Sequence, residues 1–444
     1  MSYVSRFSCL VAVLVFGNAV RAQDTFTLRE QFSPAYQYHV SSRVELAGRL
    51  TMPAEKGKEV QSLQVTGQSA LEYDERILTR SSDQNVEKTI RYYGRMDFER
   101  KVGDQVQQNS LRPEVRRLVI LRHKQVEVPF APAGPLTWGE IDMVRTDVFT
   151  PALAGLLPDK AVKVGNSWQA QPSAVQEITD FEKIEEGGLT CKLESIVSLS
   201  KRRHARVSFN GTIRGLGDDG LAKHQLDGFF FFDLESNHLS YLSMKGVHSM
   251  MDKSGATQGK IEGTFVLTRQ PSTRSKELSD EALRGLALEP NDENTLLLFD
   301  NEELGVRFLY PRRWRLAGVN GRQIGLDETR GNGGLLMTVE ALPRVPTGPQ
   351  YLQESQNWLT QQKAKVVKSD RPTTLQNPPQ ALEYFTIEAD VKDQRIPWLI
   401  TSYGNRWAGP LSPPASFPRL TSPPWSATSS ASPAACRSRG SSSK

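Results

Sequence analysis

Cysteine is scarce in this chain of 444 residues, and its three copies, Cys9, Cys191 and Cys436, lie far apart. No CxxC pair is present, which excludes the common redox and structural zinc motifs. There is also no set of cysteines from which a disulfide framework could be built. The fold must therefore be stabilised by burial of apolar side chains, and the length is sufficient for two domains with substantial cores.

Histidine is equally sparse, and none of the six copies forms an HxH or HExxH pair, so no zinc helix is predicted. A G-x-S-x-G nucleophile elbow is absent as well. Cys191 lies in an alternating pattern without a nearby base, which favours a buried thiol over a nucleophile. The sequence therefore predicts no catalytic residue, no cofactor and no metal site. The histidines are His39, His123, His204, His224, His238 and His248, of which the three from His224 onward lie near a predicted hairpin and either converge or occupy separate solvated strands.

The segment GLGDDG, Gly215 to Gly220, matches the GxGxxG pattern of dinucleotide-binding loops. Such a loop must follow a strand and open a helix, so that its N–H groups face the phosphates. Here the segment lies between two predicted strands, with Asp218 and Asp219 where an anion would bind. A hairpin turn is the better interpretation.

Long apolar runs are also missing, except for a short one near the N-terminus. Arg6 precedes the apolar stretch from Leu10 to Phe16, and Ala22 fits the small residue before a cleavage site. This pattern predicts a secretory signal peptide over residues 1–22, and the run is too short to span a membrane. We expect an extracytoplasmic protein, periplasmic or secreted, without a transmembrane span.

Acidic residues are absent from residues 408–444, which are dominated by Ser, Pro and Ala. The composition predicts disorder. It fits a natural flexible tail or out-of-frame translation of a GC-rich gene. The two ends also carry the positive charge: the formal charge of +5 falls to about −1 when residues 1–22 and 408–444 are set aside. A near-neutral body argues against nucleic-acid binding, which needs a concentrated basic surface.

Apolar residues alternate with polar ones throughout residues 23–270, which is typical of strands with one buried face. Helical spacing is scarce there, the best case being Val148 to Leu157. The pattern predicts a large antiparallel β domain, either an open, strongly curved sheet or an incomplete barrel. Its LPxxxVxVGxxW segment, which ends at Trp168, resembles a segment of uncharacterised bacterial secreted proteins and implies no activity.

Residues 271–295 predict a linker with a short helix capped by Ser279. Residues 296–407 then predict an α+β domain, a smaller antiparallel sheet with a helix packed on one face. That helix starts near Pro349, which suits a first-turn position. The fold class is therefore mainly β with an α+β part.

The phrase GVRFLYPRRW opens this second domain with a strand that stops at proline, which has no N–H to donate. The order of elements over residues 296–403 resembles the PsbP-like fold. The resemblance implies an accessory binding subunit without catalytic groups. It is incomplete, because that family continues with further strands and a C-terminal helix where this chain has its Ser/Pro-rich segment. The matching residues are Gly305, Val306, Phe308, Tyr310, Pro311 and Trp314.

A basic run precedes one strand of the β domain and is the strongest ligand-binding candidate in the sequence. It consists of Lys201, Arg202, Arg203 and Arg206. Such a run could bind an anionic lipid headgroup or polysaccharide, whereas a solvated hairpin is the simpler interpretation.

Together these features predict a non-enzymatic binding or scaffolding protein of the bacterial envelope, with a protein, lipid or polysaccharide partner. One alternative is a carrier of a lipid or other apolar ligand in the concave face of the β domain. A second alternative is a hydrolase with dispersed catalytic residues. The aromatic side chains that could line the concave face are Tyr92, Phe98, Phe209, Phe229 and Phe231.

Overall fold

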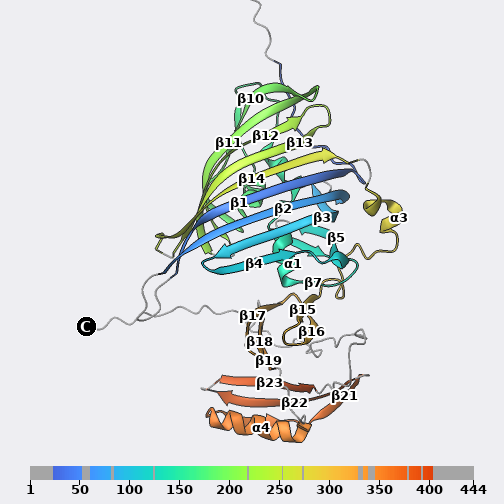
Figure 1. Cartoon of the computed structure of the whole chain (residues 1–444), viewed down its shortest axis with the longest axis vertical. Helices are drawn as coiled ribbons and strands as arrows, with labels where there is room; N and C mark the ends of the chain where they lie inside the picture. Colours follow the sequence, from blue (N-terminus) through green and yellow to red (C-terminus); the bar gives the residue numbers. More distant parts are fainter. Residues whose placement is uncertain are drawn as a thin grey trace, which may run out of the picture. The chain divides into compact units, whose positions relative to one another are not determined.

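The structure of the protein is a computed structural model. It describes residues 24–52, 61–81, 85–123, 126–217, 220–252, 254–272, 275–328, 334–338, 346–377, 380–391 and 394–403. The chain divides into two compact units (Figure 1). The first runs up to Asp300 and also includes Leu309–Pro311, and the second comprises Asn301–Phe308 and the residues from Arg312 onward.

The first unit is built on one open antiparallel sheet of 13 strands, which confirms the predicted large curved sheet. Its first strand, β1, lies between β2 and the last strand, β14, so that segments more than 200 residues apart are neighbours. Two short strands branch from the main path, β4 on β3 and β9 on β11. In spatial order the main path is β6 (Val126–Phe130), β5 (Arg117–His123), β3 (Val86–Val102), β2 (Gln61–Arg80), β1 (Gln37–Met52), β14 (Thr257–Pro271), β13 (His238–Met251), β12 (Gly220–Asp233), β11 (Arg202–Gly217), β10 (Thr190–Leu199) and β8 (Ser167–Gln169), and the branches are β4 (Gln105–Ser110) and β9 (Lys183–Gly187).

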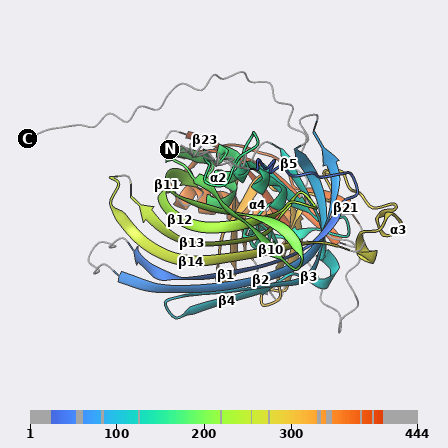
Figure 2. The same ribbon diagram turned by 90° about the horizontal axis from the view of Figure 1, so that it is seen from above.

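The strands are long and curve together in an arc (Figure 2), which gives the sheet two different faces. The inner face carries alternate, fully buried side chains such as Tyr38, Phe209 and Leu267. The residues between them point to the outer face, as expected from the two-residue period of a strand. This alternation places the core of the unit on the inner face.

Three glycines and two leucines form one row of residues that runs across neighbouring strands, here called the central row. Gly211, Leu226, Gly246, Gly263 and Leu46 lie directly opposite one another on five adjacent strands. A Cβ at Gly211 would lie 2.0 Å from the carbonyl oxygen of Gly188, which follows β9 and donates its N–H to the carbonyl of Thr212 at 3.3 Å. The missing side chain at Gly211 lets the connection between β9 and β10 approach β11 this closely.

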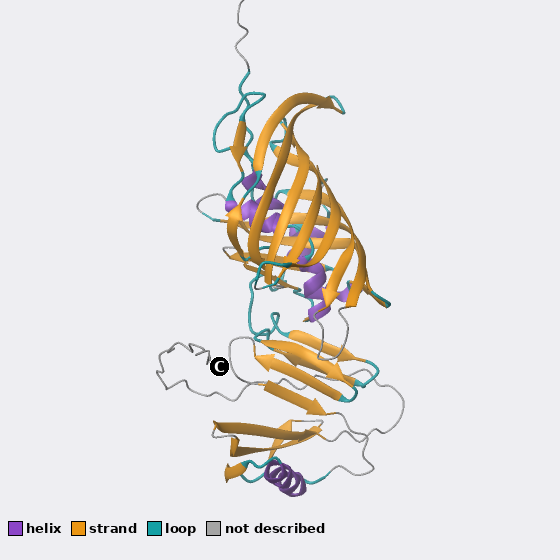
Figure 3. Cartoon of the chain, turned by 90° about the vertical axis from the view of Figure 1, so that its left-hand side faces the viewer, coloured by secondary structure: helices purple, strands orange, loops and turns teal. Residues whose placement is uncertain are grey.

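Short helices lie on the inner side of the curved sheet (Figure 3). Thr137 caps the first helix through a capping box with Glu140. The helical segment expected at Val148 to Leu157 is a 3-10 helix with Leu153 and Leu156 buried. These elements are α1 (Trp138–Arg145), η2 (Thr150–Leu156) and α2 (Pro172–Thr179).

The linker packs on the outer face at the β3–β5–β6 end of the sheet. Leu278 and Leu283 cover Ile90, Val119 and Phe130 there. Ser279 caps the linker helix as predicted, its hydroxyl accepting a hydrogen bond from the N–H of Ala282 at 3.2 Å, but the helix is only one turn long. The elements of this region are η1 (Pro113–Val115), β7 (Leu136–Thr137), η3 (Lys276–Leu278), α3 (Asp280–Leu283) and β15 (Leu297–Asn301), which pairs in parallel with β7.

The second unit contains two small antiparallel sheets and one long helix, which confirms the predicted sheet with a helix on one face. Pro349 lies in the first turn of α4, and Leu359 packs against Phe385 and Ile387. Whether the unit belongs to the PsbP-like fold stays a prediction. Its elements are β17 (Trp314–Asn320), β18 (Gln323–Glu328), β19 (Gly334–Thr338), α4 (Gly348–Gln361), β20 (Lys365–Ser369), β21 (Thr373–Asn377), β22 (Gln380–Val391) and β23 (Gln394–Tyr403), and β16 (Val306–Tyr310) stands at the boundary of the two units.

No helix within the described ranges is long and apolar enough to cross a membrane. The predicted signal peptide, residues 1–22, and the tail, residues 408–444, lie outside the described residues.

Replacing Gly211 by alanine should lower the free energy of unfolding by about 2 kcal/mol or more, because backbone atoms of Gly188 occupy the space of the new methyl group. Urea denaturation of the purified protein measures the change. The matched control is Gly94→Ala in β3, where the nearest atom to an added Cβ is 3.7 Å away. Equal stability of the two variants would contradict the close approach of Gly188 to Gly211.

Candidate functional site

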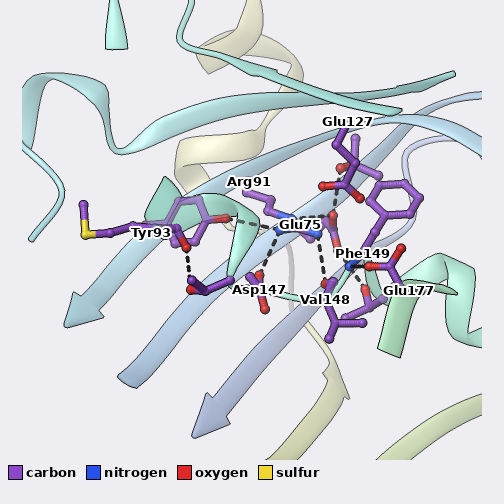
Figure 4. A network of polar contacts seen from close by, with 12 residues as sticks. Glu75, Arg91, Tyr93, Glu127, Asp147, Val148, Phe149 and Glu177 are labelled. Carbon is purple, nitrogen blue, oxygen red and sulfur yellow. Dashed lines mark hydrogen bonds and ion pairs between the residues drawn. The ribbon is translucent and has the colours of Figure 1, made fainter. Parts of the chain in front are cut away.

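The most concentrated polar chemistry of the first unit is a buried charge network centred on Arg91 (Figure 4). The Nε–H of Arg91 donates to Glu75 at 2.8 Å, and Nη1 donates to Asp147 at 2.8 Å and to the Tyr93 hydroxyl at 3.2 Å. The guanidinium also lies 4.6 Å from the centre of the Tyr73 ring. The side chains of Arg91, Glu75 and Asp147 are at most 1 % exposed, so the charges are compensated almost without water.

Glu75 is the most fully satisfied anion of this network. One carboxylate oxygen accepts hydrogen bonds from Arg91 and Thr89, the latter at 2.7 Å, and the other accepts from Tyr38 at 2.5 Å and Thr150 at 3.0 Å. Burial alone would raise the pKa of Glu75, but the Arg91 charge and these donors outweigh it and hold the pKa below its usual value. Glu75 is therefore ionised at neutral pH and links β1, β2, β3 and η2.

At Asp147 the effect of burial on the pKa is larger than the effect of the neighbouring cation. Burial raises the pKa of its carboxyl to about 6, against the opposing charge of Arg91. Arg91 itself keeps its proton: burial alone would lower its pKa, but Glu75 and the neighbouring tyrosines raise it.

A second cation, Arg122, continues the network toward α2. Its Nη1 donates to Glu127 at 3.2 Å and also contacts Glu177, whose other oxygen accepts the backbone N–H of Phe149 at 2.5 Å. Burial, followed by the negative charge of Glu177, raises the pKa of Glu127 to about 8. Two carboxyl groups here share one cation, so one of them tends to hold a proton.

These groups have the perturbed pKa values of acid–base catalysts, yet their placement is structural. They lie between the inner face of the sheet and the elements η2 and α2. None of them lines either of the two hollows on the outer face, which are formed by β1 with β11–β14 and by β1–β4. The hydrogen bonds instead join the sheet to the helical segment after α1, through Asp147, Phe149 and Glu177 (Figure 4). The network thus fixes the helices that fill the curve.

A second buried ion pair ties the N-terminal segment to the sheet. Glu30 accepts hydrogen bonds from His238 Nδ1 at 2.5 Å and from the backbone N–H of Leu239 at 2.9 Å, and it also pairs with Arg269. Burial alone would raise the pKa of Glu30, but Arg269 and His238 lower it. Tyr36 stacks on the His238 ring at 4.6 Å.

His224 and His248 do converge, whereas His238 is held elsewhere by Glu30. They are directly opposite on β12 and β13, with His248 Nδ1 2.7 Å from His224 Nε2. Burial and then the His248 charge lower the pKa of His224 to about 3. Within the described ranges, no three or more His, Cys, Asp or Glu side chains are grouped to hold a metal ion.

One hollow lies across β1, β14, β13, β12 and β11 and has a volume of about 760 Å³. Its lining consists of the central row and of the two rows beside it, whose side chains point to the outer face. Because the lining side chains of both flanking rows point outward, and the side chain of Leu226 covers Gly246 on the inner side, the hollow opens on the outer face. We call it the outer hollow. The flanking rows are Glu45, Thr264, Lys245, Asp227 and Asn210 on one side and Ala47, Glu262, Val247, Gln225 and Thr212 on the other.

A smaller, more polar hollow of about 530 Å³ adjoins it on β1, β2, β3 and β4, and the two share Glu45. Its charged lining includes Arg43, Arg95, Asp97 and Glu99. Both hollows therefore belong to one open, mixed-charge surface.

Of the predicted basic run, the first two residues lie at the β10–β11 hairpin. Lys201 is exposed in the turn with φ of +67°. Arg202 pairs with Asp233 at 2.9 Å and with Glu235 at 3.2 Å, so its charge is already compensated.

The other two basic residues stack on aromatic rings. The guanidinium of Arg203 lies 5.8 Å from the Phe26 ring centre, and that of Arg206 lies 5.0 Å from the Phe229 ring centre. The four residues thus have separate surroundings, and binding of an anion by the run stays a prediction.

The residues predicted as structural motifs lie at element ends. Gly305 has φ of +63° and precedes β16, Tyr310 is its buried last residue, Pro311 follows it, and Trp314 opens β17. They contribute no reactive arrangement.

Trp168 in β8 donates its indole N–H to the carbonyl of Leu156 at 2.9 Å and pairs with Cys191 in β10. Cys191 is fully buried, and burial raises the pKa of its thiol to about 12, so the thiol is unreactive. The GLGDDG segment is the β11–β12 hairpin, with Gly217 opposite Gly220, which confirms the turn interpretation; Asp218 and Asp219 lie outside the described residues.

The aromatic side chains proposed to line one concave face do not share a face. Phe209 is buried on the inner face, and Phe98 points the same way. Tyr92, Phe229 and Phe231 point outward. In β3, a bulge beside Gly94 shifts the alternation, so that Tyr92 and Phe98 point to opposite faces. In β12, four consecutive phenylalanines alternate between the two faces, which places Phe229 and Phe231 outward.

A scan of protein-family models and a search of curated proteins find no match for this chain.

Replacing Arg91 by methionine should lower the free energy of unfolding by about 3–5 kcal/mol, because it leaves the buried carboxylates of Glu75 and Asp147 without their cation. Chemical denaturation at pH 7 measures the loss. The control is Arg95→Met, whose ion pair with Asp97 is exposed and contributes little. A stable Arg91→Met protein would show that the network is dispensable.

The stability contributed by Glu127 should depend on pH. Its folded-state pKa of about 8 exceeds the ordinary value of 4.5, so the folded state binds the proton more tightly and stability falls as the pH rises between those values. Glu127→Gln should match the wild type near pH 5 and exceed it at pH 9, by on the order of 1–2 kcal/mol.

Guanidinium denaturation at the two pH values checks this expectation, with Glu186→Gln on exposed β9 as the control. Parallel pH profiles for wild type and Glu127→Gln would rule out a raised pKa at this position.

Proposed function

We propose that the protein is an extracytoplasmic, non-enzymatic binding protein that holds an envelope partner on the outer face of its large sheet. The outer hollow is the observation that carries this proposal. It is open, its lining comes from five neighbouring strands, and it combines apolar, amide, hydroxyl and charged groups. Such a surface can bind a ligand by shape and by hydrogen bonds without a reaction.

The distribution of ionisable groups supports binding over hydrolysis. The carboxyl groups with raised pKa values, Asp147 and Glu127, connect the sheet to its helices. The thiol of Cys191 is buried and protonated. A hydrolytic site would need such groups at the wall of a hollow that admits substrate.

The sequence adds two supports. The N-terminal pattern predicts export, and the resemblance of residues 296–403 to the PsbP-like fold implies an accessory binding subunit. A carrier role in the concave face is not proposed, because the two hollows described above open on the outer face and the aromatic side chains expected to line the concave face do not share a face.

Replacing Thr264 by tryptophan fills the outer hollow and tests the proposal without knowledge of the ligand. Thr264 is exposed in β14 at the middle of the lining. We expect at least tenfold weaker co-sedimentation of the variant with envelope fragments prepared from the host cells. Thr257→Trp, at the exposed start of the same strand, should sediment like the wild type. Equal sedimentation of all three proteins would overturn the proposal.

A further inference from the structure

Three aromatic rings form a cluster on the outer face beside the outer hollow, here called the aromatic platform. Phe229 and Phe231 lie on β12 and Tyr241 on β13, with ring centres 5.5–5.8 Å apart. All three are partly exposed, whereas the intervening Phe230 and Phe232 are fully buried on the inner face. A cluster of partly exposed rings on a sheet face is a candidate contact surface for a ligand.

The platform is held in place by its neighbours. Phe231 and Tyr241 are directly opposite each other in the β12–β13 pair. Arg206 lies over the Phe229 ring at 5.0 Å, and His204 contacts Phe231 edge-on. Rings fixed in this way lose little side-chain freedom when a ligand stacks on them.

A row of polar groups continues the platform into the outer hollow. Asp227 is two residues from Phe229 on β12, so both point to the same face. Asn210, Asp227, Lys245 and Thr264 are directly opposite one another on four strands, and Glu45 follows on the fifth. At about 4.8 Å between strands, the row is about 19 Å long.

We infer that this surface binds a neutral polysaccharide chain, an inference that rests on the proposed binding function. The C–H faces of sugar rings stack on the electron-rich faces of aromatic rings, and ring hydroxyls pair with amide, carboxylate and ammonium groups such as those of Asn210, Asp227 and Lys245. The length of the polar row matches several linked sugar rings, and the open hollow lets a polymer pass.

The charges of the lining favour a neutral chain over a polyanion. Three carboxylates, Glu45, Asp227 and Glu262, line the outer hollow with one cation, Lys245, and Arg206 at the aromatic platform is a second cation. An aromatic platform that binds nucleic acid is accompanied by a positively charged groove, and an anionic headgroup would need the same. The acidic surplus here disfavours both.

The experiment is affinity electrophoresis of the whole protein in gels that contain a neutral polysaccharide: dextran, a soluble β-glucan, mannan or galactan. Heparin and alginate gels serve as the polyanion comparison. We expect retardation by at least one neutral polymer and none by the polyanions. Phe231→Ala and Tyr241→Ala should weaken that retardation at least tenfold in dissociation constant, because each removes a stacking surface.

The conservative variant Tyr241→Phe keeps the ring and should bind nearly as well as the wild type, and thermal melting verifies that each variant is folded.

Retardation by no neutral polymer, or full retardation of folded Phe231→Ala and Tyr241→Ala, overturns the inference. If Thr264→Trp still abolishes envelope sedimentation in that case, the binding function stands and only the ligand class is wrong. If Thr264→Trp sediments like the wild type, the binding function itself has failed.

Discussion

The arrangement of the first unit depends on the compensation of Arg91 inside the protein. A guanidinium with 1 % of its side chain exposed has to be surrounded by acceptors, and those acceptors come from distant parts of the chain: Glu75 from β2 and Asp147 from the segment after α1. Because each partner would be costly to bury alone, the strands and the helical segment are fixed together. The helical segment is thereby held against the inner face of the sheet.

The two faces of the sheet are specialised by different residue types. Along the central row, glycines let backbone segments and inner-face side chains come close, as where the carbonyl oxygen of Gly188 lies beside Gly211 and Leu226 lies against Gly246. On the outer side the same row forms the floor between two lines of polar side chains. The linker covers the outer face near Ile90, through Leu278 and Leu283, whereas Glu45, Lys245 and Thr264 on the outer face are exposed.

Much of the architecture could be predicted from the alternation of apolar and polar residues. The buried network around Arg91 could not. The two-residue period identified the long strands, and Ser279 and Pro349 marked helix starts. Glu75 falls on the apolar phase of β2, between the buried Tyr73 and Ile77, and that position was an available signal for a buried charge.

Other features of the structure leave no signal in the nearby sequence. The bulge beside Gly94 reverses the phase of β3, so that Arg91 points inward and Tyr92 outward. Pairing of residues as distant as Arg91 and Asp147 depends on the tertiary fold. Four consecutive phenylalanines likewise do not reveal which two are exposed, since that depends on the register between β12 and its neighbours.

The position of β1 between β2 and β14 has a consequence for the order in which the protein can assemble. When β1 and β2 have been synthesised, the other edge of β1 has no partner until β14 follows, more than 200 residues later. During that interval a long strand with free N–H and C=O groups is exposed to association with other chains. Pairings this distant in sequence also form slowly. A chain that stays unfolded until β14 has been synthesised avoids that interval.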